Sequence, residues 1–183
     1  MSPSDYAALL LVLLGFAVLT GLVAWYSPGR RIWAPATLAL LVAAGAVAAV
    51  PAFVDIADGA QTVLLVALGG ALAVAGGGPL TALVFDLVDR RETVAESMDR
   101  AGHVLRGGAW IGALERVAIF ATLLAGWPEG LAVVLAVKGL GRYPELRAAE
   151  DGVRTGAAER FIIGTFASVL WACACAGVVL LVR

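Results

Sequence analysis

Apolar residues occupy long runs along this chain, and short polar stretches separate the runs. Each run is close to 20 residues, the length that an α-helix needs to cross about 30 Å of hydrocarbon. None has the ten-residue alternation of a membrane β-strand. The pattern predicts an all-α, polytopic membrane helix bundle with about six transmembrane helices. The expected spans form one integral membrane domain over residues 1–183 and cover residues 6–26, 34–54, 62–85, 107–126, 128–143 and 160–182, with Pro144 stopping the fifth.

A hydrophilic segment, residues 86–106, separates the third and fourth spans. Its apolar residues recur at helical spacing, so it is expected to form an amphipathic helix on the cytoplasmic membrane surface. Acidic stripes of this kind can bind a divalent cation, but beside arginines they are typical of a solvated, salt-bridged face. We therefore predict no metal site and no cofactor. The stripe consists of Asp89, Glu92, Glu96, Asp99 and His103.

Composition supports a membrane protein. Of all residues 61% are hydrophobic and 15% are charged, against roughly 45–50% and 25% in soluble domains. The net charge of -1 gives no indication of nucleic-acid binding, and P-loop, C-x-x-C and H-E-x-x-H patterns are missing. The expected partner is the lipid bilayer, and a second copy or another membrane protein remains open.

Basic residues follow an alternating distribution among the loops. Lys and Arg, such as Arg30 and Arg31, occur after the first, third and fifth spans, whereas the loops after the second and fourth spans have none. By the positive-inside rule the basic loops are cytoplasmic. The protein is thus expected in a bacterial inner membrane with both termini on the external side. The first run lacks preceding basic residues and exceeds a signal-peptide core in length, so it is expected to be a mature helix.

The third span contains Gly76, Gly77, Gly78 and Pro79, which lower helix propensity and remove one backbone donor. This composition predicts a helix break or kink, and a broken helix would expose backbone groups to a solute. The alternative is a close-packing glycine surface, with Pro79 opening a new helical segment. Small residues also recur in the last span, where Gly164, Ser168 and Ala172 predict a seam for close helix contact.

The fourth and fifth spans form an apolar hairpin that carries charges. Glu115 lies eleven residues before Gly126, and Lys138 lies ten after Pro128, so both lie roughly 15–17 Å from the turn. Opposite charges at equal depth predict a buried ion pair. Arg116 points about 100° away from Glu115. It therefore needs another partner, for which Asp86, a helix C-terminus, a lipid phosphate or a transported anion are the candidates.

These charges define a predicted buried cluster between helices four, five and six. We expect it to transport or conduct a small ion or polar solute. In a second hypothesis the protein is a non-catalytic subunit or structural membrane protein, whose charges only lock helices together. In a third it is an enzyme acting on lipids with carboxylates such as Asp86 as ligands, but no motif supports this, and we predict no catalytic residue. The cluster comprises Glu115, Arg116, Lys138, Arg142, Glu159 and Arg160.

The C-terminal half carries an ordered set of motifs. They are D-R-A-G, W-I-G-A-L-E-R, A-V-K-G-L-G-R-Y, A-E-R-F-I-I-G-T and S-V-L-W, within residues 99–171. This order resembles a family of uncharacterised bacterial integral membrane proteins with I-G-x-L-E-R, A-A-K-S-I-x-R-F and A-E-Y-x-I-I-G-T. The chain departs from that pattern at Gly139 and Gly141 and lacks a histidine and an aspartate in the core of its first helix. The resemblance carries no activity, but it implies that the shared pattern includes Glu115, Arg116, Lys138, Arg142, Glu159 and Gly164.

Overall fold

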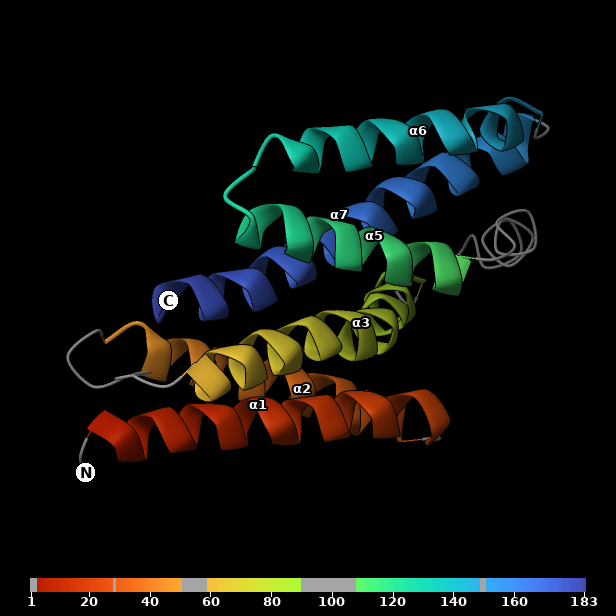
Figure 1. Ribbon diagram of the computed structural model, residues 1–183. Coiled ribbons are helices and arrows are strands. Elements are labelled where there is room, and N and C mark those ends of the chain that lie inside the picture. The colour runs from red at the N-terminus through yellow and green to blue at the C-terminus, as the bar shows by residue number, and fades with distance from the viewer. Residues whose placement is uncertain (1–2, 28, 51–58, 90–107, 149–150) are drawn as a thin grey trace.

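The computed structural model describes residues 3–27, 29–50, 59–89, 108–148 and 151–183. Within these ranges the secondary structure is entirely helical. Successive helices run in alternating directions, so the start of α1 and the end of α7 lie at the same end of the bundle (Figure 1). The helices are α1 (Pro3–Tyr26), α2 (Arg30–Ala48), α3 (Gly59–Asp89), α5 (Gly108–Leu124), α6 (Gly130–Ala148) and α7 (Asp151–Leu181).

Four helices in the described ranges are long and apolar enough to cross a membrane. They are α1, α2, most of α3 and the part of α7 from Ala158. The protein is therefore a membrane-embedded helix bundle. The helices α5 and α6 do not meet the same standard of length and apolarity, so the six-span arrangement stays a prediction. The expected amphipathic helix and its acidic stripe fall largely on residues 90–107, outside the described ranges.

Several helix bounds differ from the expected spans. The second helix begins at Arg30 and ends at Ala48, and the last one begins at Asp151. The expectation that Pro144 stops a helix was wrong, because α6 continues through it to Ala148. A proline removes the donor to only one carbonyl, and helices in membranes tolerate this loss when neighbouring turns stay bonded.

The apolar core lies where α1, α2, α3 and α7 meet. Many of its residues are leucines, which fill the space between helices, and alanines, which let the helix backbones approach one another. Among them are Leu10, Leu72, Ala44 and Ala176. The predicted seam of α7 is present, since Gly164 contacts α3 side chains and Ser168 and Ala172 are buried. Phe120 of α5 joins this core, whereas α6 contributes no residue to it among those described.

The glycine-rich part of α3 is continuous helix, so there is neither a break at Gly76 to Pro79 nor a new helical segment that begins at Pro79. A kink stays a prediction, and the close-packing part of the alternative describes this surface. A methyl group at Gly76 would overlap the indole of Trp171, one at Gly77 would overlap Arg116, and one at Gly78 would overlap Trp25. Side chains from α7, α5 and α1 therefore enter three successive gaps in the surface of α3.

Pro79 leaves a backbone acceptor free, and another helix occupies it. Proline has no N–H, so the carbonyl of Ala75, four residues earlier, receives no helical hydrogen bond from it. The indole Nε1 of Trp25 donates to that oxygen at 2.7 Å. The Nε1 of Trp171 also donates to an α3 carbonyl, that of Leu72, at 3.2 Å. Two indoles thus join α1 and α7 to the backbone of α3, where lipid could supply no donor.

Candidate functional site

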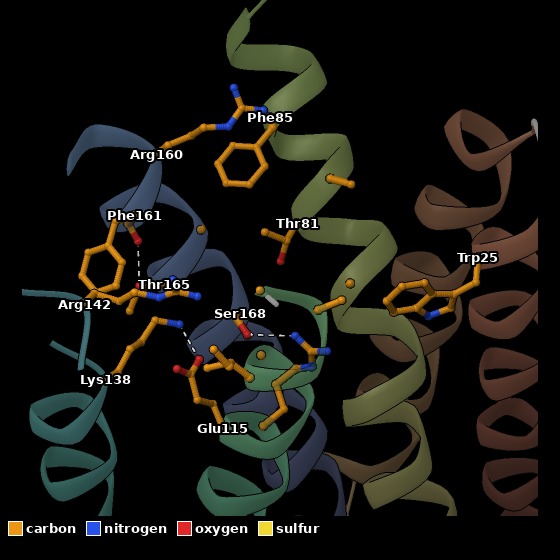
Figure 2. Close-up of a pocket in the computed structure, with 18 residues that line it drawn as sticks. Trp25, Thr81, Phe85, Glu115, Lys138, Arg142, Arg160, Phe161, Thr165 and Ser168 are labelled. Atoms are coloured by element: carbon orange, nitrogen blue, oxygen red, sulfur yellow. Dashed lines mark hydrogen bonds and ion pairs between the residues drawn. The ribbon is translucent and has the colours of Figure 1, made fainter. Parts of the chain in front are cut away.

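A cavity of about 390 Å³ lies among α3, α5, α6 and α7, with Trp25 of α1 at its edge (Figure 2). Five of the six residues of the predicted cluster line it. The sixth, Glu159, lies on the exposed side of α7, because adjacent helix positions differ by about 100°. The charged lining residues are Glu115, Arg116, Lys138, Arg142 and Arg160.

The predicted ion pair between Glu115 and Lys138 is present. The Nζ of Lys138 donates to Oε2 of Glu115, and the two side chains are 15% and 11% exposed. The turn at Gly126, whose φ of 71° suits glycine, reverses the chain so that both residues reach the same depth. The other carboxylate oxygen, Oε1, is buried and has no hydrogen-bond partner among the described residues. The pair therefore retains unused acceptor capacity inside the bundle.

Arg116 is the most deeply buried charge of the cavity, with 3% of its surface exposed. Its Nη1 donates to the hydroxyl of Ser168 at 3.1 Å and its Nη2 to the carbonyl of Val74 at 3.4 Å. Its Nε has no partner among the described residues. Space for the guanidinium comes from Gly77 across the interface and from Gly112 one turn earlier on α5. A buried positive charge thus has only neutral hydrogen-bond partners, and Ser168 is a site residue that the spacing did not reveal.

Asp86 does not pair with Arg116, contrary to one of the expected possibilities. Its Oδ2 accepts from Nη2 of Arg30 at 2.8 Å and lies 4.0 Å from Nε of Arg31. The helix α3 extends beyond the cavity, which carries this carboxylate to the end of the bundle where α2 begins. Asp86 thus balances one of the two positive charges at the start of α2.

The cavity has a polar floor and a rim. We call Glu115, Arg116, Lys138 and Ser168 the floor, and Phe85 and Arg160 the rim. Figure 2 shows the labelled rim residues at one end, Glu115 at the other, and Lys138 and Arg142 between. At the rim the Arg160 guanidinium lies 4.7 Å from the centre of the Phe85 ring. Arg160 and Ser168 are eight residues apart on α7, so rim and floor are separated by about 12 Å.

The floor carries one net positive charge, because Arg116 and Lys138 contribute two cations and Glu115 one carboxylate. A charge is costly in a low-dielectric interior unless an opposite charge compensates it. Fold and site together define a helical membrane bundle with a partly open, cation-lined cavity. No protein-family model, curated protein or solved structure matches the chain. The resemblance in the C-terminal half stays a prediction, and geometry and charge are the basis for function.

Proposed function

We propose that this protein binds a small monovalent anion at the floor of the cavity and transports it across the membrane. The observation that carries the proposal is the buried Arg116, whose hydrogen-bond partners are all neutral. A bound anion would compensate its charge and accept hydrogen bonds from the floor. Charge-assisted bonds of this kind contribute about 1.5–3 kcal/mol each, enough to make an anion a ligand and not a passing counterion.

The transport proposal includes six membrane crossings. The exposed sides of α5 and α6 favour this, because Leu114 and Leu140 are 69% and 74% exposed and would face lipid. With Arg30, Arg31 and the other basic loops in the cytoplasm, the termini lie outside an inner membrane and the rim faces the cytoplasm. Single cysteines at Asp58 and Glu129, in a variant without native cysteines, should react with an impermeant reagent in right-side-out vesicles. Cysteines at Ala95 and Gly152 should not react, and labelling at Ala95 would contradict this orientation.

Methanesulfonate is a suitable probe for the anion site, because it is a monovalent anion that does not cross lipid by protonation. We expect it to bind the full-length protein in phosphatidylcholine nanodiscs, measured by calorimetry, and tetramethylammonium not to bind. Arg116→Gln should weaken binding about tenfold or more, since one charge-assisted contact is lost. Arg147→Gln, a change at an exposed arginine of α6 outside the cavity lining, should leave affinity within about twofold.

Glu115→Gln removes a negative charge from the floor, whereas Arg116→Gln removes a positive one. The glutamine still offers an acceptor to Lys138. It removes the only carboxylate of the floor, so methanesulfonate should bind more tightly than to the unmodified protein. Uptake of labelled methanesulfonate into proteoliposomes should fall in Arg116→Gln and persist in Arg147→Gln. Equal affinity in folded Arg116→Gln and Glu115→Gln variants would exclude an anion site, and binding without uptake would exclude transport.

A structural role is the second candidate, and a specific contact favours it. The Nη2 of Arg116 donates to a carbonyl of α3, so the guanidinium also joins two helices. In this case the charges lock the bundle as part of a larger complex. Native mass spectrometry would then find a stoichiometric protein partner, and no methanesulfonate would bind. The enzyme hypothesis stays a prediction, because Asp86 pairs with Arg30 and most of the other cytoplasmic carboxylates lie outside the described residues.

A further inference from the structure

We propose that the anion is organic, with its charged group at the floor and an apolar body, about the size of one aromatic ring, against Phe161. This inference rests on the proposed function and specifies the substrate class of the same site. Its first basis is size. The cavity of about 390 Å³ is many times the roughly 10–15 Å³ that a cavity needs, on the same measure, to hold one water molecule. It falls instead within the roughly 300–1,000 Å³ of pockets that bind organic ligands.

The second basis is the chemistry of the wall. Above the floor the wall carries the cations Arg142 and Arg160, but most of its other residues are aromatic, aliphatic or very small, and the small residues create the open space. Ala82 belongs to α3, and Gly108 and Ala109 begin α5. A hydrated inorganic ion gains nothing from the apolar part of this wall, whereas an apolar group loses its contact with water there. The wall therefore selects a ligand that is not charged throughout.

The third basis is the position of Phe161 relative to the charges. Its ring lines the cavity, and the Nζ of Lys138 lies 5.8 Å from the ring centre. An anionic group held by the floor cations would therefore place its attached body beside this ring (Figure 2). The hydroxyl of Thr165, one turn further along α7, already donates to the backbone carbonyl of Phe161 at 2.6 Å. That part of the wall thus offers the body an apolar surface.

Benzenesulfonate and methanesulfonate test this inference, because they share one charged group and differ in the body. In phosphatidylcholine nanodiscs benzenesulfonate should bind at least about tenfold more tightly than methanesulfonate, the gain expected from burying a ring. Nanodiscs without protein correct for partition into lipid. Phe161→Ala should remove most of this preference, measured as the ratio of the two affinities within one variant, so that any change at Lys138, which contacts the ring, affects both sulfonates alike.

The matched control is Phe166→Ala on the same helix, because Phe166 is 63% exposed on the outside of the bundle. It should keep the full preference. If Phe161→Ala does not fold, Phe161→Leu should reduce the preference partly. Equal affinity for the two sulfonates, or a preference that survives both Phe161 substitutions, would overturn the inference.

The outcomes separate the two proposals. Suppose that methanesulfonate binding depends on Arg116 but benzenesulfonate binds no more tightly. The proposal of an anion site would then stand, and the proposal of an organic substrate would be excluded. Binding of neither sulfonate would exclude both. An organic anion could be a soluble compound or the headgroup of an anionic lipid. Nanodiscs that contain phosphatidylglycerol distinguish these sources. If the protein binds anionic lipid headgroups, phosphatidylglycerol should compete with benzenesulfonate and lower its apparent affinity. If the protein binds only soluble anions, phosphatidylglycerol should not compete.

Discussion

Two regions of this bundle are held together by different forces. Where α1, α2, α3 and α7 meet, alanines, glycines and leucines interdigitate, and indoles occupy backbone acceptors. The helix α6 is attached differently, through Lys138 on Glu115 of α5 and beside Phe161 of α7. Lipid is as apolar as leucine, so helices in a membrane associate through close packing or polar contacts and not through hydrophobic burial. The closely packed region contains the apolar core, and the region joined by charges contains the cavity.

The largest expected effect comes from breaking the charged attachment of α6. Glu115→Ala or Lys138→Ala should each destabilise the protein by roughly 3–5 kcal/mol, because each leaves a buried charge without its partner. The double substitution should lose clearly less than the sum of the two. Unfolding in mixed detergent micelles measures all three variants. Additive losses would show that the two side chains do not stabilise one another.

A smaller loss should follow a substitution in the closely packed region. Gly76→Ala places a methyl group against the buried indole of Trp171, and overpacking of this kind costs about 1–3 kcal/mol. The control is Gly139→Ala in α6, where a methyl group meets open space and should be neutral or slightly stabilising. The same unfolding assay compares them. Equal stability of the two variants would mean that close packing does not hold α3.

The smallest effect concerns the hydrogen bond between α1 and α3. Trp25→Phe keeps a ring against Gly78 and removes the donor to Ala75, so it should destabilise by about 1–2 kcal/mol. In a Pro79→Ala background the new N–H can bond to Ala75 within the helix, and the same change should cost less. A loss that is equal in both backgrounds would show that Trp25 acts by packing alone. Pro79→Ala by itself should be close to neutral.

Contacts could be predicted from the sequence where the interacting residues lie on one helix or one hairpin. Glu115 and Lys138 could be paired because both lie on a single hairpin with a recognisable turn, so residue counting gives their depth. The helical class and the seam at Gly164, Ser168 and Ala172 depend on local periodicity in the same way. Neither needs knowledge of how distant helices are arranged.

Prediction from the sequence failed where the partner comes from a distant helix. Arg116 bonds to Val74 and Ser168, which are 42 and 52 residues away in sequence. Three adjacent glycines of α3 are compatible with a break or with close packing, and the side chains that face them decide which. The helical periodicity of the sequence does not reveal which side chains of other helices face these glycines. For the same reason the pairing of Asp86 with Arg30, 56 residues away, was not foreseen.

The bond from Trp25 to Ala75 has a consequence for the order of assembly during synthesis. The two residues are 50 positions apart, so α1 has left the ribosome before α3 is complete. When α3 enters the bilayer, the donor for its free carbonyl is already present on an earlier helix. If α3 inserted without α1, that oxygen would face hydrocarbon or retain a water molecule. The earlier helix therefore brings to the later one the donor that keeps this carbonyl from being buried without a hydrogen bond.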